Sequence, residues 1–145
     1  MGAARCRDRN GSLHDHQYRL GYPLTDHAAD FIAAFASEFE LASDFNAIHA
    51  LCERTVGSID GVGELAVYDI AERIGWSFGV EPQQVYLHSG TLKGAKALFP
   101  ALKGKRLAME ALPSAFEGLS AAEVENLFCI CKTRIEALRQ SGRLT

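Results

Sequence analysis

Two glycines one residue apart, Gly61 and Gly63, stand directly before a stretch with helical spacing, and they constrain the chain more than any other feature. Because glycine has no side chain, the backbone can bend here through positive φ and approach a partner closely. The first amides of the following helix, expected from about Glu64 to Ser77, have no acceptors within the helix. A helix start of this kind attracts anions, and a nucleic-acid phosphate is one candidate.

Most of the chain repeats its apolar residues at helical spacing. Strand-like character is limited to Val85–Leu87, which is too short to predict a strand. Ser120 and Glu123 form a capping box before the clearest amphipathic helix. The other expected caps are Thr25 or Asp26 for a helix running to about Ala42, Ser43 or Asp44 for residues 45–56, and Thr91 for residues 93–98. Short helices or turns are expected over residues 83–89 and 102–112.

These elements predict an all-α fold, a compact multi-helix domain over residues 23–142 after a flexible polar leader over residues 1–22. A length of 145 residues suffices for one domain with a full core. The net charge of -3 argues against a strongly basic nucleic-acid binder but permits a local basic patch. No apolar run could span a membrane, so we expect no membrane partner.

The four cysteines are Cys6, Cys52, Cys129 and Cys131. The N-terminus lacks the apolar core of a secretion signal, so reduced thiols and a cytoplasmic location are expected. Cys129 and Cys131 are too close in sequence for a zinc knuckle, and buried structural thiols are expected instead. His49 and Cys52 lie one helical turn apart and, with Cys129 or Cys131, offer a zinc site as the alternative. No metal cofactor is predicted.

Residues 45–76 resemble the helix-hairpin-helix family: a helix, the Gly61-Val62-Gly63 hairpin, and a helix with the small residue Ala66 near its start. The resemblance implies that hairpin amides at Gly61, Gly63, Glu64 and Leu65 hold one phosphate of DNA or RNA without reading bases. In some members a monovalent cation, held by hairpin carbonyls, assists. The implied function is sequence-independent, non-enzymatic backbone binding.

One departure concerns charge. DNA-binding members of the family usually carry Lys or Arg just after the second glycine, whereas this chain has Glu64, with Asp60 before the turn. Each carboxylate would repel a phosphate by about 1 kcal/mol when well solvated. A Gly-x-Gly turn before a helix also occurs as a plain packing turn, and this alternative stands beside the phosphate site.

A second, more distant resemblance is to the helix-hairpin-helix DNA glycosylases, whose hairpin is followed by a Val-Asp-x-His segment with a catalytic Asp. Here the corresponding segment is Val85-Tyr86-Leu87-His88. Tyr86 stands in place of the Asp, and Leu65 stands in place of the Lys of bifunctional members. Tyrosine cannot stabilise an oxocarbenium-like sugar as a carboxylate does, and leucine cannot form a Schiff base. The resemblance therefore implies a chain without this chemistry.

A basic segment begins at the helix start expected near Thr91. Residues 93–106 hold five of the fifteen basic residues and no acidic one: Lys93, Lys96, Lys103, Lys105 and Arg106. With Thr91 as cap and ligand, this segment suits a nucleic-acid backbone. A solvated, lysine-rich face is the alternative interpretation.

Three further groups invite a functional interpretation. His14, His16 and His27 offer metal ligands, although a polar leader explains the first two better. Trp76, Tyr68 and Tyr86 offer faces for base stacking, although Trp76 beside Phe78 is expected in the core. His88 with Tyr86, Ser89 and Thr91 offers an enzyme or small-molecule site. The remaining alternative function is a protein-interaction or homodimer module, which the acidic hairpin and the apolar side of the last helix would suit.

Overall fold

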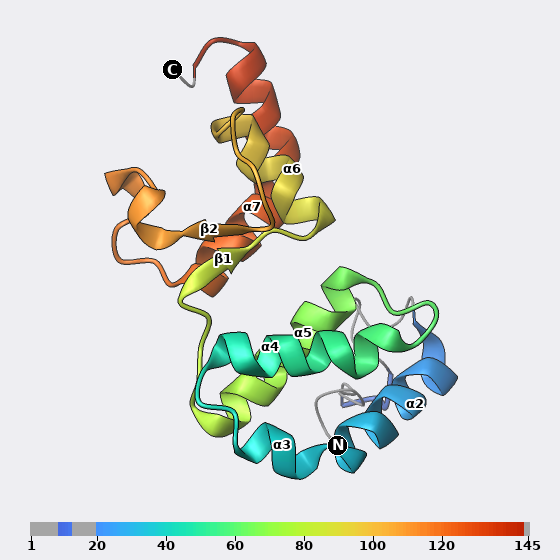
Figure 1. Ribbon diagram of the computed structural model, residues 1–145. Coiled ribbons are helices and arrows are strands. Elements are labelled where there is room, and N and C mark those ends of the chain that lie inside the picture. Colours follow the sequence, from blue (N-terminus) through green and yellow to red (C-terminus); the bar gives the residue numbers. More distant parts are fainter. Residues whose placement is uncertain (1–8, 13–19, 144–145) are drawn as a thin grey trace. The chain divides into compact units, whose positions relative to one another are not determined.

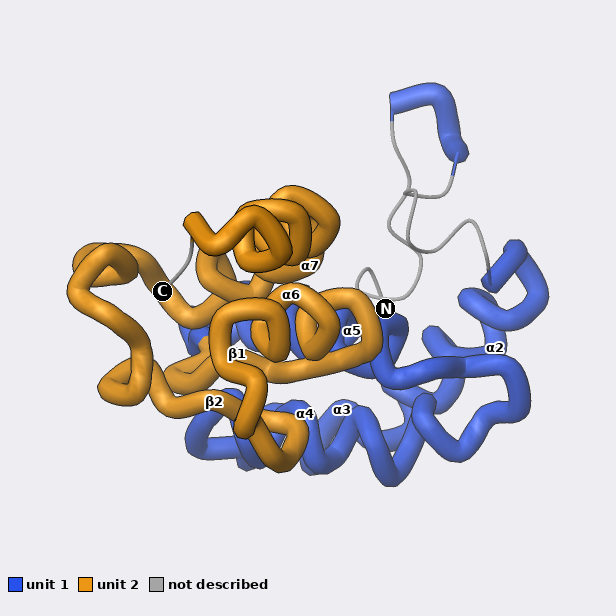
Figure 2. Tube along the Cα trace, turned by 90° about the horizontal axis from the view of Figure 1, so that it is seen from above, with its two compact units in different colours: residues 1–81 blue, residues 82–145 orange. Residues whose placement is uncertain are grey.

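The computed structural model describes residues 9–12 and 20–143 of the chain (Figure 1). The chain divides into two compact units, residues 1–81 and 82–145 (Figure 2), and the domain expected over residues 23–142 spans both. The expected mostly helical architecture is confirmed. Most of the expected leader, with His14 and His16, lies outside the described residues, and its last two positions already belong to the first helix.

The first unit is helical throughout its regular elements. These are α2 (Gly21–Ala34), α3 (Ala36–Glu40), α4 (Phe45–Arg54), the 3-10 turn η1 (Val56–Ser58) and α5 (Glu64–Phe78). Its buried residues include Phe45 and Ile48 of α4 and Val67, Ile70 and Ile74 of α5. A Cβ at Gly75 would lie 2.5 Å from the Val80 carbonyl oxygen and 3.2 Å from the Phe45 ring, so α4 and α5 pack closely because position 75 is glycine.

Helix boundaries in this unit follow local caps in two places and depart from them in one. Asp44 caps α4 as expected, accepting a hydrogen bond of 2.9 Å from the Ala47 amide. Helix α5 begins at Glu64 as expected. The expected start of the first helix at Thr25 or Asp26 is wrong, because Thr25 is buried and donates to the Tyr22 carbonyl at 2.9 Å, inside a helix that begins at Gly21. Phe35 also divides the expected single helix into α2 and α3.

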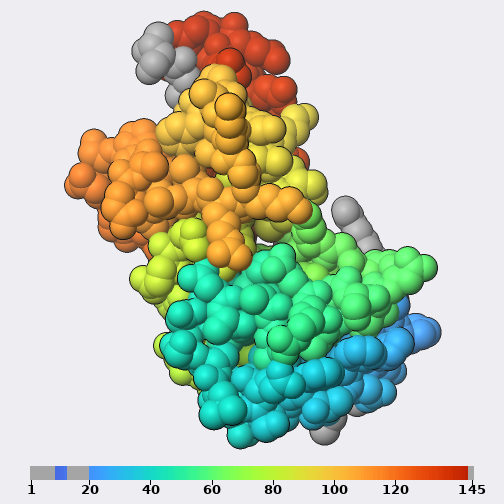
Figure 3. Space-filling view, in the orientation of Figure 1, coloured from blue at the N-terminus to red at the C-terminus, as the bar shows by residue number. Residues whose placement is uncertain are grey.

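The second unit combines a small sheet with helices. Its elements are β1 (Gln84–Tyr86), α6 (Ser89–Leu98), β2 (Arg106–Ala108), the 3-10 turns η2 (Met109–Ala111) and η3 (Ser114–Phe116), and α7 (Ala121–Gln140). The strands pair antiparallel with Val85 opposite Leu107, both buried. The expectation of no strand and of a helix over residues 102–112 is therefore wrong. Segment 109–119 lies in the orange lobe at the left of Figure 3, and its residues Met109, Leu112 and Phe116 pack against the core of this unit.

Helices α6 and α7 lie in direct backbone contact. A Cβ on Gly94 would lie 2.2 Å from the Phe128 carbonyl oxygen, which no side chain could accommodate. Val124, Phe128 and Ile135 of α7 are buried in the core of the unit, together with Val85 and Leu107 of the sheet. The expected capping box is present: Glu123 accepts from the Ser120 amide at 2.8 Å, and Ser120 accepts from the Glu123 amide at 3.2 Å.

The apolar side of α7 that could have formed an intermolecular interface thus serves the core of its own unit. Ile130, which is exposed, lies outside that core. Among the helices of the described residues, we find none with the length and apolar character needed to cross a bilayer.

Candidate functional site

The hairpin between α4 and α5 is a tight turn without side-chain caps. The Val62 amide donates to the Ile59 carbonyl at 3.0 Å, and Gly61 follows the left-handed region with φ 88°. Gly63 is the N-cap of α5 with φ -89° and ψ 170°, and as a glycine it has no side chain to cap the first turn. The first helical bond outside the turn runs from the Val67 amide to the Gly63 carbonyl at 3.1 Å. The amides that precede it have no acceptor within the helix.

The hairpin is open to solvent at the positions that matter for an anion. Gly61, Gly63 and Glu64 are exposed, whereas Leu65 is half-buried. A Cβ built on Gly63 meets no atom within 4 Å, so the space beside the helix start is open. Asp60 is exposed as well, so both carboxylates foreseen from the sequence stand on the solvent side of the turn.

The basic segment belongs to the second unit. Lys93 and Lys96 lie on α6, Lys103 and Lys105 lie in the connection to β2, and Arg106 lies on β2; all are exposed. The Arg106 guanidinium stacks over the Tyr86 ring at 4.9 Å from its centroid. Lys93 pairs with Glu136 of α7 at 3.3 Å. The structure therefore gathers these cations on one unit, while the hairpin belongs to the other.

Thr91 takes a different position from the one expected. His88, not Thr91, is the N-cap of α6, and Thr91 lies within the first turn. Its side chain is 0% exposed, and its hydroxyl donates to Glu125 Oε1 at 2.5 Å. The expectation that Thr91 caps the helix and binds a phosphate is therefore wrong, because its hydroxyl is buried and hydrogen-bonded inside the unit.

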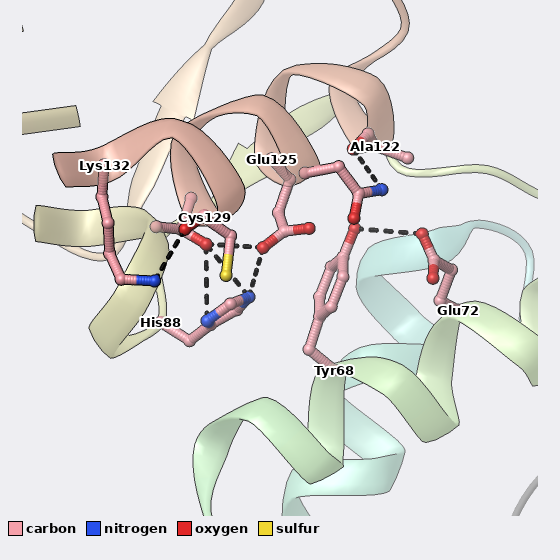
Figure 4. Close-up of polar contacts among 9 residues, drawn as sticks. Tyr68, Glu72, His88, Ala122, Glu125, Cys129 and Lys132 are labelled. Atoms are coloured by element: carbon pink, nitrogen blue, oxygen red, sulfur yellow. Dashed lines mark hydrogen bonds and ion pairs between the residues drawn. The ribbon is translucent and has the colours of Figure 1, made fainter. Parts of the chain in front are cut away.

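A buried polar cluster joins the start of α6 to α7 (Figure 4). His88 Nε2 lies 2.5 Å from Glu125 Oε1 and 3.1 Å from Thr91 Oγ1. His88 and Glu125 are each 5% exposed. Figure 4 also shows the Cys129 sulfur directed toward this cluster. Burying polar groups is costly unless hydrogen bonds satisfy them, and here the side chains of His88, Thr91 and Glu125 all lie within hydrogen-bond distance of one another.

The geometry of this cluster does not suit nucleophilic catalysis. In a Ser-His-Asp relay the hydroxyl and the carboxylate contact opposite ring nitrogens. Here the carboxylate lies at Nε2, the nitrogen that is also nearer to Thr91 Oγ1, and the hydroxyl donates directly to the carboxylate. Glu125 therefore holds the imidazole and the hydroxyl together, and the cluster ties α6 to α7.

The sequence pattern did not predict that Glu125 is buried, because a charged side chain is expected on the solvent side of an amphipathic helix. Its spacing nevertheless carried a signal, since it lies four residues after Ala121 and three before Phe128, both buried on the inner side of α7. A carboxylate at an inward position of an amphipathic helix needs a buried partner. His88, which follows the buried residues Val85–Leu87, was available for that role.

The cysteines that the structure describes differ in how deeply they are buried. Burial raises the pKa of the Cys52 thiol to about 12, with a smaller contribution from nearby Glu53. Cys129 and Cys131 are half-buried in the other unit. Within residues 9–12 and 20–143, no group of three or more His, Cys, Asp or Glu side chains is arranged to hold a metal ion.

Trp76 corrects another expectation. It is 58% exposed, and Phe78 is exposed beside it at the end of α5, so neither belongs to the core. Helix α5 ends at Phe78, and Gly79 follows as its C-cap in the left-handed conformation. Tyr68 and Tyr86, by contrast, are buried.

A groove between α6 and α7 was not foreseen from the sequence. It has a volume of about 460 Å³ and is lined by Lys93, Lys96, Ala97, Glu136, Arg139 and Gln140. The Arg139 guanidinium donates to the Lys96 carbonyl at 3.5 Å, which brings the two cationic residues together. No sequence spacing links residues 96 and 139, because their proximity depends on the packing of α6 on α7.

Comparison with known proteins finds no relative of this chain. The chain matches no family model, no curated protein and no solved structure. The functional assignment therefore depends on the residues and distances described above.

Proposed function

We propose that this protein binds nucleic-acid backbones without reading sequence, through a helix-hairpin-helix-like unit at residues 45–78. The observation that carries the proposal is the exposed start of α5 at Gly63, which has no capping side chain and leaves open space where a Cβ would stand. Such helix starts bind phosphates through hydrogen bonds and the helix dipole. A monovalent cation at the hairpin carbonyls is part of the same proposal.

The exposed cations of the second unit supply the second part of the proposal. Lys93, Lys96, Lys103, Lys105 and Arg106 are exposed on one unit and attract a polyanion. Asp60 and Glu64 oppose a phosphate at the hairpin, and the whole chain carries a net charge of -3. We therefore expect weak binding that falls steeply as the salt concentration rises.

Fluorescence anisotropy with labelled duplex and single-stranded oligonucleotides, at several salt concentrations, tests this function. Gly63→Val places a side chain over the helix start, at a position whose extended conformation accepts a β-branched residue and where no neighbour obstructs it. We expect this variant to lose about tenfold or more in affinity while its circular dichroism and melting temperature stay near those of the parent protein.

Ala36→Val is the control, because it adds an exposed valine to α3, away from the hairpin. It should bind as the parent protein does. Replacing Lys93, Lys96 and Lys103 by Ala should weaken binding and flatten the dependence of log affinity on log salt. No binding at low salt, or binding that none of these changes alters, would reject the function.

A further inference from the structure

The groove between α6 and α7 in the second unit is lined by more positively than negatively charged side chains. Lys93 and Glu136 pair across it at 3.3 Å and neutralise each other. Lys96 and Arg139 also line the groove, and neither forms an ion pair with any residue that the structure describes. The lining thus carries two more positive than negative charges.

A hydrogen bond places the Arg139 side chain against the backbone of Lys96, and both residues line the groove. The Arg139 guanidinium donates to the Lys96 carbonyl at 3.5 Å, which fixes the α7 residue against the last turn of α6. The contact between Gly94 and the Phe128 carbonyl sets how closely the two helices approach before the groove. The half-open space of about 460 Å³ between them is far larger than a single water molecule needs.

We propose that this groove binds a phosphate group between Lys96 and Arg139. A guanidinium offers a planar fork of donors that matches phosphate oxygens, and an ammonium adds a compact charge. Two free positive charges match the dianion of a phosphate, and the Gln140 side chain at the same groove supplies a neutral donor. Arg139 thereby becomes a ligand that the basic segment alone did not include.

This inference rests on the proposed function in part, because Lys93 and Lys96 belong to both sites. The phosphate has two sources, a free phosphate or pyrophosphate ion and the backbone of a nucleic acid. A cation at a helix end also offsets the helix dipole. If Lys96 and Arg139 only offset the helix dipole, replacing them would change the stability of the protein, and the groove would bind no phosphate.

The test uses the full chain with inorganic phosphate, pyrophosphate and a short single-stranded oligonucleotide as separate probes at constant ionic strength. Amide chemical shifts from nuclear magnetic resonance locate each probe, and titration gives its affinity. We expect pyrophosphate to shift amides around Lys96 and Arg139. Lys96→Gln and Arg139→Gln should each weaken binding about tenfold, and Glu136→Gln should strengthen it.

Arg134→Gln is the matched control, since Arg134 is an exposed residue of the same helix outside the groove lining. It should leave pyrophosphate affinity unchanged. Groove shifts with pyrophosphate but no binding of the oligonucleotide would keep the phosphate site and reject nucleic-acid binding. Groove shifts with the oligonucleotide alone, lost in Arg139→Gln, would identify the backbone as the phosphate source.

Two results would overturn the groove site. One is the absence of groove shifts with all three probes, even where the oligonucleotide binds at the hairpin. The other is an equal loss of affinity in Arg134→Gln and Arg139→Gln, which would show that only overall charge matters.

Discussion

The Gly94 Cα stands so close to the Phe128 carbonyl that a Cβ there would come within 2.2 Å of the oxygen. The obstructing atom belongs to the backbone of α7, so it cannot turn aside as the end of a side chain could. Helices α6 and α7 can therefore keep their present distance only with glycine at position 94.

Gly94→Ala should destabilise the second unit, because the helices must separate and the core around Phe128 must open. Overpacking of this kind costs about 1–3 kcal/mol, and we expect the upper part of this range. Urea unfolding followed by circular dichroism measures the change. Lys96→Ala, an exposed substitution on the same helix, is the control and should change the free energy of unfolding by less than about 0.5 kcal/mol.

Glu125→Ala should be strongly destabilising, because it leaves the buried His88 and the Thr91 hydroxyl without their common partner. Breaking a buried pair by removing one member costs about 3–5 kcal/mol. A double-mutant cycle with Thr91→Val measures how far the two side chains depend on each other. Strict additivity of the two changes would contradict the shared hydrogen bond, since groups in contact normally couple.

The capping box at Ser120 makes stability depend on pH. The hydrogen bond from the Ser120 amide, with a smaller contribution from the Ser120 side chain, holds the pKa of Glu123 below its usual value of 4.5. A carboxyl with a lowered pKa contributes stability that is complete above 4.5 and is lost as the pH falls through the folded pKa. Glu123→Gln should therefore lose less unfolding free energy than the parent protein between pH 5 and acidic pH of about 3.

This dependence is measured by urea unfolding at a series of pH values. Glu117→Gln serves as the control, since it removes an exposed carboxyl outside the capping box. The parent protein and this control should show the same slope at acidic pH. A slope in Glu123→Gln as steep as theirs would contradict the assigned role of the carboxylate.

Cys52 should resist thiol reagents in the folded protein. Its pKa of about 12 leaves almost no thiolate at neutral pH, and its side chain is buried. Alkylation with iodoacetamide at a pH near 8, about half a unit below the pKa of a free thiol, followed by peptide mass spectrometry, should label Cys52 only after denaturation. The half-buried Cys129 and Cys131 provide the internal comparison, and labelling of Cys52 ahead of both would contradict its burial.

Local signals in the sequence predicted much of the helical framework. Asp44, the Gly61-Val62-Gly63 turn and the Ser120–Glu123 box each act within a few residues, and the helices they predicted are present. The first helix departs from its signal because burial of Thr25 places that hydroxyl inside the helix. Cap preferences are weaker than the packing that determined this boundary.

Contacts distant in sequence could not be predicted in the same way. Val85 gains its strand conformation by pairing with Leu107, and neither short segment carries enough alternation to indicate a sheet alone. His88 with Glu125 and Lys96 with Arg139 likewise meet only because α6 packs on α7. The candidate residues on single segments were thus identifiable, whereas the partners that define their environment were not.

The order β1-α6-β2-α7 interleaves the parts of the second unit: the first and third elements pair as strands, and the second and fourth pack as helices. A fragment that stopped before β2 would lose the partners of both β1 and α6 at once, exposing Val85 and the glycine face of α6. Assembly of this unit therefore requires β2 and α7 together, so its elements cannot be completed one after another in chain order.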